Sequence, residues 1–422
     1  MEKQEKFDVV VVGAGIMGSC SAYEVAKRGY SVLLLEQYDF LHRRGSSHGE
    51  TRTIRITYPE PYYVSMMKEA FRLWYKAQEE AGYRVHTPMQ HLDFGHPSNS
   101  SLQEVISACS MHSIHVETLT PDEASCRFPP FSFPDDHVVL VTQEGGVIHA
   151  SKAVAMFQAL ALKHGAVLRD RTKVLNIDLL GMKGEGGDGS ISIVTEQGSI
   201  IARKCIITAG AWTQKLLRHI HNVELPIQPL HTTIAYWKIE DEVAHEFSVK
   251  QGFPSFAYYS DTYMYGNASL ELPGLVKVAL HSGFTCDPDE RALIPDRKTL
   301  KDVVSPWLDT FLKAKVKSDS PVLAEACMYS MTPDQDFILD FLPMSEGNIV
   351  IGAGFSGHGF KMGPLVGRIL ADLALNGSCG YVPLEYFSIA RFDQNSKGNV
   401  KAYEEPVRHV AVEQVKPDAV IT

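Results

Sequence analysis

The sequence contains no apolar run that approaches the roughly 18 residues needed to cross a bilayer. This absence excludes a protein anchored by membrane-spanning helices. Residues 1–7 are charged and lead directly into an apolar segment, so we expect no secretory signal. The expected partners therefore include no membrane.

Cysteine is sparse, since the 422 residues contain seven and none forms a CxxC pair. An odd, scattered set in a large chain is typical of reduced thiols inside the cell. The last three residues are Val420, Ile421 and Thr422, so the simple peroxisomal tripeptide is absent. We therefore expect the protein in the cytoplasm, with the peroxisome as the alternative.

Positive charge is also not in excess. Lys plus Arg number 40 and Asp plus Glu 50, which leaves a formal net charge of −10 and no basic run. This disfavours nucleic acid as a partner but allows a small basic pocket for an acidic substrate. Hydrophobic residues at 45% and charged residues at 21% exclude a mainly disordered chain. The length predicts two or three domains at about 150 residues each.

The first 36 residues have the pattern of a strand–helix–strand unit. Residues 7–12 are apolar and end at a glycine, which predicts a buried parallel strand. A helix is predicted over 13–28, closed by Gly29, and a second apolar strand over 31–35. This βαβ order is the start of a dinucleotide-binding sheet.

Later segments predict further pieces of the same sheet, separated by β-rich insertions. Helical spacing recurs over 62–82, and apolar strands are predicted at 205–208 and 348–353. We expect a mixed α/β fold in which a Rossmann-like domain is interleaved with a strand-rich substrate domain. The first domain would comprise 1–90, 145–220 and 320–400, the second 91–144 and 221–319, followed by a tail at 401–422.

The strongest motif is the GxGxxG turn formed by Gly13, Gly15 and Gly18, with Ala14 inside it. Gly13 permits the turn, Gly15 admits a pyrophosphate to the backbone, and Gly18 lets helix and strand pack closely. Glu36 follows the next strand and can accept hydrogen bonds from ribose hydroxyls. An acid here disfavours the 2′-phosphate of NADP, whereas FAD and NAD both stay open.

Two arginines three residues apart, Arg52 and Arg55, follow within a stretch rich in glycine and serine that begins at Gly45. Arginine suits bidentate recognition of a carboxylate, so an anion could bind here. The alternative is a solvated loop.

Further along, Lys277 and His281 have the spacing of one strand face and could project together into a cavity, although an ordinary surface strand is the other interpretation.

Two further sequence motifs lie near the C-terminus. One is 327–334, Cys-Met-Tyr-Ser-Met-Thr-Pro-Asp, in which a lone cysteine is by itself unremarkable. The other is the glycine-rich stretch 352–363, which leads into a helix and could present backbone donors to an anionic ring system, with Lys361 at its rim.

Taken together, the motifs resemble those of the monomeric sarcosine oxidase family of flavoprotein amine oxidases. The likeness is to its eukaryotic sarcosine/pipecolate oxidases, over about 7–399.

The resemblance implies FAD rather than NAD, with the flavin joined through its 8-methyl carbon to the thiol of Cys327. It also implies a set of residues around the cofactor. These are Gly13, Ala14, Gly15, Gly18, Glu36, Gly45, Ser46, His48, Val174, Gly210, Trp212, Cys327, Gly357, Gly359 and Lys361.

The resemblance further implies the roles at the reaction site. Arg55 and Lys361 would bind the substrate carboxylate, and Lys277 would hold a water and assist oxygen reduction. Arg52 and His48 would lie near the flavin ring. The cavity would be lined by Tyr265, His281 and Tyr329, although the interval from Tyr265 to Lys277 is one residue longer than in the bacterial enzymes, which loosens the assignment of Tyr265.

The expected function is therefore a monomeric FAD-dependent oxidase of secondary amino acids. Sarcosine, L-pipecolate or a related N-methyl or cyclic amine would react with oxygen to give an imine and hydrogen peroxide. Three alternatives stay open at this point. They are a flavin oxidase or dehydrogenase of a specialised cyclic amine, an NAD-dependent dehydrogenase, and a flavin-binding protein without catalysis. The sequence predicts no metal site.

Overall fold

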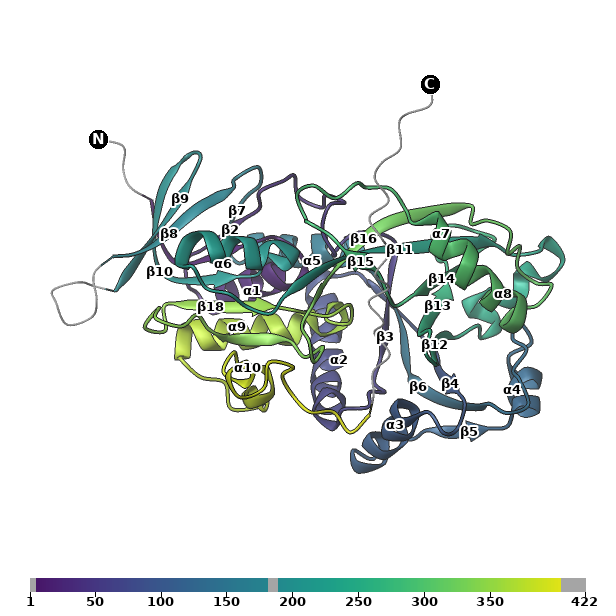
Figure 1. The fold of residues 1–422 in the computed structure, drawn as a ribbon. Coiled ribbons are helices and arrows are strands. Elements are labelled where there is room, and N and C mark those ends of the chain that lie inside the picture. The colour runs from purple at the N-terminus through teal and green to yellow at the C-terminus, as the bar shows by residue number, and fades with distance from the viewer. Residues whose placement is uncertain (1–4, 181–188, 404–422) are drawn as a thin grey trace, which may run out of the picture.

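The computed structural model describes residues 5–180 and 189–403, and these form two sheets joined side by side with helix α2 between them (Figure 1). The predicted mixed α/β architecture is confirmed. Residues 404–422 of the predicted tail lie outside the described residues. No helix within the described part of the chain is long and apolar enough to cross a membrane.

The first sheet has the strand order β17-β18-β10-β1-β2-β7, extended by β8 and β9 at β10. Its centre is parallel because β1 pairs in parallel with both β2 and β10. Its strands are β1 (Lys6–Val12), β2 (Val32–Leu35), β7 (Val167–Arg169), β8 (Val174–Leu180), β9 (Ser190–Thr195), β10 (Gly198–Ile207), β17 (Ile338–Phe341) and β18 (Ile349–Ala353).

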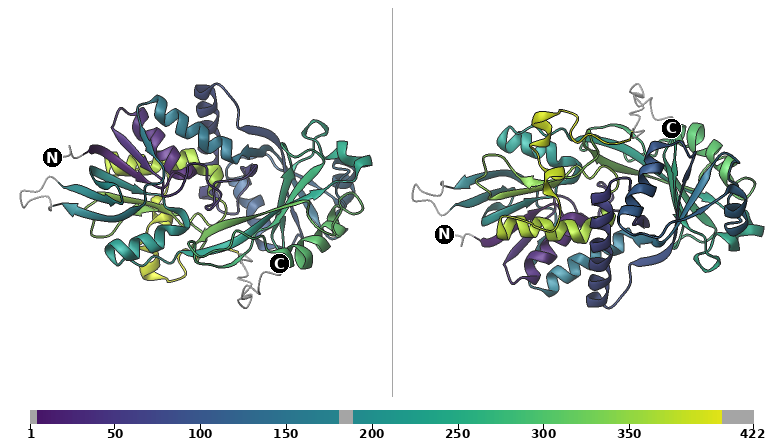
Figure 2. Two further views of the ribbon diagram at one scale, coloured as in Figure 1. Left: turned by 90° about the horizontal axis from the view of Figure 1, so that it is seen from above. Right: turned by 90° about the horizontal axis from the view of Figure 1, so that it is seen from below.

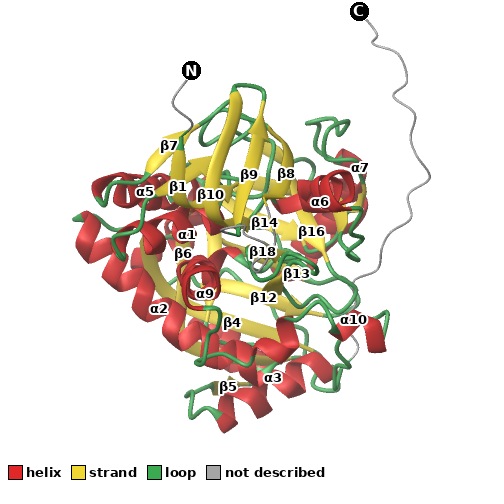
Figure 3. Ribbon diagram, turned by 90° about the vertical axis from the view of Figure 1, so that its left-hand side faces the viewer, coloured by secondary structure: helices red, strands yellow, loops and turns green. Residues whose placement is uncertain are grey.

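Both faces of this sheet are covered. Alternate residues of β1 explain this, since Val9 and Val11 pack with the helices α1, α5 and α9, while Val10 and Val12 pack with the β8–β9 hairpin and α6. Figure 3 shows the layers, with helices below the sheet and the hairpin above it. A strand buried on both faces needs the unbroken apolar run that β1 has.

The second sheet has the order β15-β11-β14-β13-β12-β4-β6-β3, with β16 paired to β11 and β5 to β6. One face packs on an aromatic core that contains Phe94, Trp237 and Trp307. Its strands are β3 (Thr51–Arg55), β4 (His86–Gly95), β5 (Glu117–Leu119), β6 (Val138–His149), β11 (Gln228–Lys238), β12 (Ser255–Tyr259), β13 (Met264–Ala268), β14 (Leu275–Leu280), β15 (Phe284–Thr285) and β16 (Leu323–Met331).

Apart from α2, the helices pack on the faces and edges of these sheets, as the two views in Figure 2 show. They are α1 (Ile16–Lys27), α2 (Pro61–Ala81), α3 (Ser100–Met111), α4 (Pro121–Arg127), α5 (Ala150–Lys163), α6 (Thr213–His221), α7 (Arg297–Thr299), α8 (Ser305–Phe311), α9 (Gly363–Asn376) and α10 (Arg391–Gln394), with short 3-10 turns η1 (Gly210–Trp212), η2 (Asp241–Phe247), η3 (Val249–Gln251), η5 (Phe360–Met362) and η6 (Leu384–Phe387) and a π turn η4 (Leu300–Val304).

The sheet pairing differs from the predicted segmentation at two strands. β3 pairs with β6 and β16 with β11, so both belong to the second sheet, although 1–90 and 320–400 were expected in the cofactor domain. Both pairings are antiparallel and join segments far apart in the sequence, which local patterns do not reveal. The limits of the two domains stay a prediction.

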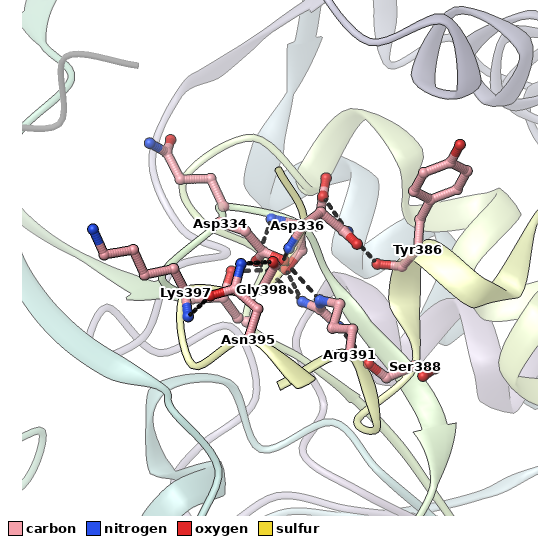
Figure 4. Close-up of polar contacts among 12 residues, drawn as sticks. Asp334, Asp336, Tyr386, Ser388, Arg391, Asn395, Lys397 and Gly398 are labelled. Atoms are coloured by element: carbon pink, nitrogen blue, oxygen red, sulfur yellow. Dashed lines mark hydrogen bonds and ion pairs between the residues drawn. The ribbon is translucent and has the colours of Figure 1, made fainter. Parts of the chain in front are cut away.

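A C-terminal strap, residues 384–403, crosses back over the turn at 334–336 (Figure 4). Arg391 makes a two-pronged ion pair with Asp334, with Nε 2.7 Å and Nη2 3.2 Å from the carboxylate oxygens. Gly398 has φ +77°, and a Cβ there would lie 2.2 Å from Asp334 Oδ2, so only glycine fits. The first residues of the predicted tail also belong to the fold, because Lys401 Nζ lies 2.8 Å from both Glu60 and Asp336.

We expect Arg391→Ala to lower the free energy of unfolding by about 3–5 kcal/mol, since it leaves the Asp334 carboxylate buried and unpaired. The Arg391 and Asp334 side chains are only 5% and 0% exposed. The control is Arg203→Ala, whose side chain is 78% exposed beside Asp8, and its expected loss is under about 1 kcal/mol. Urea unfolding of both variants measures the two losses. Equal losses would show that the strap contributes nothing beyond a surface contact.

Candidate active site

The glycine turn after β1 has the close contacts that its motif predicts. Gly13 has φ +97°, and a Cβ there would lie 2.5 Å from the carbonyl oxygen of Thr208. A Cβ on Gly18 would lie 1.8 Å from the carbonyl oxygen of Gly13, so helix α1 can approach β1 only with glycine there. Gly15 is the N-cap of α1, and a Cβ there would lie 3.0 Å from Ser47 Oγ, which accepts a hydrogen bond from the N–H of Ile16 (3.1 Å).

Glu36 lies directly after β2 and joins this turn. Its Oε2 accepts a hydrogen bond from the backbone N–H of Ala14 (3.0 Å), and its Oε1 accepts one from that of Tyr38 (3.1 Å). Burial acts to raise the pKa of Glu36, but hydrogen bonds from His42, Ala14 and Tyr38 outweigh it and lower the pKa. Glu36 is therefore an ionised acceptor at the end of the cavity next to the glycines.

A cavity of about 630 Å³ is lined by this turn and by residues of the second sheet. It brings together residues that are more than 300 positions apart in the sequence. Of the predicted site residues, its walls contain Gly13, Ala14, Gly15, Glu36, Gly45, Ser46, Arg52, Arg55, Val174, Gly210, Trp212, Tyr265, His281, Cys327, Tyr329, Gly357, Gly359 and Lys361. Three others, Gly18, His48 and Lys277, lie behind the walls.

Cys327 is on β16, whose pairing with β11 directs it to the cavity. All seven cysteines are in the described part of the chain, and Cys327 alone among them lines the cavity. Its Sγ lies 3.9 Å from Nη2 of Arg52.

Arg52 is held by backbone carbonyls. Its Nη2 donates to the carbonyl oxygens of Ser46 (2.9 Å) and His48 (2.7 Å), and its Nη1 donates to that of Thr51 (2.9 Å). His48 itself is buried behind it, and burial together with the charge of Arg52 lowers the pKa of His48 to about 4. His48 is therefore neutral at physiological pH.

Neither interpretation of the spacing of Lys277 and His281, a shared cavity or an ordinary surface strand, describes Lys277, which is buried but does not line the cavity. The structure places His281 on the cavity wall just after β14 ends, whereas the Lys277 side chain is 1% exposed behind β3. Its Nζ donates to the carbonyl oxygen of Thr51 (2.7 Å), and this hydrogen bond draws it away from the wall. Burial and the charge of Arg52 lower the pKa of Lys277 to about 7.

Arg55 is the most heavily bonded side chain of the site. Its Nη1 donates to Asp93 Oδ1 (3.1 Å) and to the hydroxyl of Tyr259 (2.8 Å), and its Nη2 donates to the hydroxyl of Tyr263 (3.0 Å). Burial acts to lower its pKa, but the tyrosine oxygens and Asp93 outweigh it and raise the pKa. The guanidinium is therefore a permanent charge with a fixed orientation.

Lys361 lies in η5 at the start of α9 and shares a neighbour with Arg55. Its Nζ donates to the hydroxyl of Tyr58 (2.9 Å) and the carbonyl oxygen of His358 (3.1 Å). The ring centre of Tyr58 lies 5.2 Å from Lys361 Nζ and 5.0 Å from Arg55 Cζ. Burial, then the charge of Arg55, lowers the pKa of Lys361 well below its usual value. Two adjacent buried cations form a site that an anion would stabilise.

Aromatic side chains line the cavity near these cations. The hydroxyls of Tyr265 and Tyr329 lie 3.4 Å apart, and the ring centres of His281 and Tyr329 lie 5.1 Å apart. Gly357 has φ +78°, and a Cβ there would lie 2.6 Å from His281 Cε1 and 2.8 Å from Tyr329 Cε2. Gly357 therefore lets these rings approach the glycine-rich loop.

Sequence reasoning missed Tyr58, Asp93, Tyr259 and Tyr263, which hold the two cations. One signal could have revealed Asp93. It interrupts the apolar pattern of β4 between Leu92 and Phe94, and a buried acid in such a strand needs a cationic partner. The tyrosines carry no comparable signal, because tyrosine is common in strands.

Comparison with known proteins agrees with this geometry. A family model described as FAD dependent oxidoreductase matches residues 8–373. A probable sarcosine oxidase of Arabidopsis thaliana is 48% identical over 95% of this chain and 96% of its own, and a peroxisomal sarcosine oxidase of Homo sapiens is 37% identical over 94% and 99%. The structure of NikD, an unusual amino acid oxidase essential for nikkomycin biosynthesis, superposes with a TM-score of 0.77 at 25% identity, over 91% of this chain and 97% of that one.

These matches decide between the cofactors that the glycine turn left open, and FAD replaces NAD. The resemblance inferred from the motifs is confirmed across nearly the whole chain. The chain belongs to the FAD-dependent oxidoreductase family and, within it, to the sarcosine oxidases.

Proposed function

We propose that the protein oxidises a secondary amino acid, such as sarcosine, L-pipecolate or a related N-methyl or cyclic amine, to an imine and passes the electrons to oxygen. The observation that carries this proposal is the pair Arg55 and Lys361, which share Tyr58 on the wall of the cavity that also contains the glycine turn and Cys327. The names of the plant and human relatives support the same chemistry.

The residues present fit FAD. The turn at Gly13 and Gly15 and the acceptor Glu36 would hold the adenosine and pyrophosphate half, as in other dinucleotide sites. The loop that contains Gly357 and Gly359 would lie against the flavin half, with Cys327 on the neighbouring wall. Bound FAD supplies a two-electron acceptor for the carbon beside the amine nitrogen and a donor to oxygen.

The chain's own groups would orient the substrate. The guanidinium of Arg55 and the ammonium of Lys361 would bind its carboxylate, which fixes the position of the carbon to be oxidised. Tyr265, Tyr329 and His281 would cover the reacting carbon and exclude water. The low pKa of His281, about 4 because of burial, keeps this ring neutral, so it adds no third charge.

We also propose that Cys327 carries the flavin as a thioether. The support is its unique position among the cysteines and its contact with Arg52. In Cys327→Ser, we expect all flavin to leave the protein on acid precipitation, whereas the wild type and the control Cys286→Ser retain it. The measurement is flavin absorbance in pellet and supernatant. Flavin that stays on Cys327→Ser after acid would exclude this attachment.

Oxygen consumption and peroxide formation test the proposed function. With purified protein we expect peroxide from sarcosine, L-pipecolate or both. Reduction of the protein by these amines without peroxide would favour the dehydrogenase alternative, and a bound flavin that no amine reduces would favour the non-catalytic one. Lys361 argues against the latter, because it is buried on the cavity wall next to Arg55, and an anionic ligand there would offset the cost of burying its charge.

We propose that the protein acts as a monomer, which is supported by the name of a bacterial relative, the monomeric sarcosine oxidase of Bacillus sp., 33% identical over 91% of this chain. A small-molecule amine and oxygen are its proposed partners. The cytoplasmic location expected from the sequence stays a prediction. The peroxisome is the alternative, since the human relative is named a peroxisomal sarcosine oxidase.

A further inference from the structure

A buried carboxylate lies directly behind the arginine of the proposed substrate site. Asp93 on β4 has a side chain that is 1% exposed, and its Oδ1 lies 3.1 Å from Arg55 Nη1. The same oxygen accepts a hydrogen bond from the Tyr259 hydroxyl (3.1 Å). Asp93 is not part of the cavity wall, so it acts on a ligand through Arg55.

The other groups around Asp93 carry no charge. His91, two residues earlier on the same face of β4, has Nε2 3.3 Å from Asp93 Oδ1 and Nδ1 2.9 Å from the Ser255 hydroxyl. Burial lowers the pKa of His91, despite the opposing effect of Asp93, and keeps the ring neutral. Thr57 on the β3 side bonds to Arg55 through a hydroxyl and a carbonyl oxygen. Asp93 is therefore the one anion facing Arg55 among the described residues.

A charge count follows from these contacts. Arg55 contributes one positive charge and Asp93 one negative charge at 3.1 Å, so the two cancel. A carboxylate bound beside Lys361 favours its ammonium form, so Lys361 leaves a single positive charge for that ligand, while the other cation of the wall, Arg52, lies beside Cys327. The other acid on this side of the cavity, Glu60, shares Lys401 with Asp336, each at 2.8 Å. Burial raises the pKa of Asp336, so Lys401 balances the charge of Glu60. One substrate carboxylate completes neutrality, and a second would be a buried anion without a partner.

We propose that Asp93 is a positioning residue that sets the charge of the accepted substrate: by neutralising Arg55, it admits amino acids with one carboxylate and discriminates against those with two. This inference rests on the proposed function, in which Arg55 and Lys361 bind the substrate carboxylate. A role limited to orienting Arg55 would weaken all carboxylate ligands alike. A role in charge selection changes the ratio between ligands that differ only in charge.

N-methyl-L-asparagine and N-methyl-L-aspartate are such a pair, because an amide replaces a carboxylate of nearly the same shape. In the wild type we expect kcat/KM, or the inhibition constant against sarcosine where turnover is absent, to favour the amide by about tenfold or more. In Asp93→Asn we expect this preference to fall to about one, since the freed charge of Arg55 can balance the second carboxylate. Asp93→Glu, which keeps the charge, should retain the wild-type preference.

Asp372→Asn is the matched control. Asp372 makes an ion pair of 3.0 Å with Arg28 on the helices of the first sheet, and neither residue lines the cavity. The same chemical change there should leave the ratio unaltered. Asp93→Ser is a second neutral variant should Asp93→Asn fail to fold. A wild-type ratio near one, or an unchanged ratio in a folded neutral variant, would overturn the proposal.

The two ligands also bind without turnover, and their dissociation constants can be read from the flavin absorbance of the holoprotein. These dissociation constants test the charge selection by Asp93 separately from the proposed oxidase function. If no amine yields peroxide but the amide still binds about tenfold more tightly than the dicarboxylate, the proposed function fails and the charge selection by Asp93 stands. If sarcosine is oxidised and the binding ratio is near one, the function stands and the role of Asp93 fails.

Discussion

Replacing Lys277 by methionine is expected to slow the reaction of the substrate-reduced protein with oxygen by about 10²–10³-fold, while reduction by substrate changes little. Lys277 is fully buried and held by the Thr51 carbonyl at 2.7 Å, so its charge has a fixed position one strand behind the cavity wall. In the low dielectric constant of the protein interior, a positive charge one strand behind the wall still stabilises the negative charge that develops on oxygen as it is reduced. Methionine keeps the length and removes the charge.

Stopped-flow measurement of the two half-reactions separates these effects. The control is Lys152→Met, at a lysine whose side chain is 60% exposed beside Glu271, and neither half-reaction should change there. Equal slowing of both half-reactions in Lys277→Met would mean that the substitution disturbs the site as a whole. Lys277 would then have no specific role with oxygen.

The pKa of Lys277 predicts a pH dependence for the same step. Burial, with Arg52 acting in the same direction, lowers this pKa to about 7, so the ammonium form prevails below pH 7 and is lost as the pH rises through it. We expect the wild-type rate with oxygen to fall as the pH rises through about 7 and that of Lys277→Met to stay flat. A parallel fall in both proteins would assign the titration to another group.

Arg55→Ala is expected to reduce kcat/KM for carboxylate substrates by about 30- to 5,000-fold. This corresponds to a loss of about 2–5 kcal/mol in the binding of the transition state. The loss has two parts. The substitution removes the guanidinium that would bind the carboxylate, and it leaves the Asp93 carboxylate buried without its cation. Arg55→Ala combined with Asp93→Asn removes the second part, so we expect the double variant to recover some of the activity.

Steady-state kinetics with sarcosine and with a secondary amine of similar size that lacks a carboxylate measures this effect. The amine without a carboxylate should lose little, because it has no group for Arg55 to bind. An equal loss for both amines would point to collapse of the cavity wall. No loss for sarcosine would mean that the carboxylate binds elsewhere.

The regular parts of the fold follow local patterns that the sequence makes visible. The helix predicted over 13–28 is observed over Ile16–Lys27, and the apolar run at 7–12 forms β1. Part of the glycine turn is equally local, because the carbonyl oxygen of Gly13 leaves no room for a Cβ on Gly18. Such features depend on neighbours in the sequence, so composition and spacing suffice to predict them.

The candidate site depends on pairings that no local pattern contains. β3 contains Arg52 and Arg55 and joins β6, about 95 residues away, and only this pairing brings Arg55 near Asp93 and Tyr259. The side-chain direction of Lys277 was also not predictable, since the Thr51 carbonyl that attracts it belongs to another strand. The resemblance to a known family placed Arg55, Lys361 and Cys327 in one site, whereas the residues that hold the cations became visible only in three dimensions.

The most direct test of the proposed oxidase is a two-step experiment on the purified holoprotein. The protein is mixed with sarcosine without oxygen while the flavin absorbance is followed, and air is then admitted and peroxide is measured. The account predicts that the yellow colour bleaches, returns with air, and yields about one peroxide per flavin. Colour that no secondary amino acid bleaches, or bleached protein that air does not restore, would contradict it.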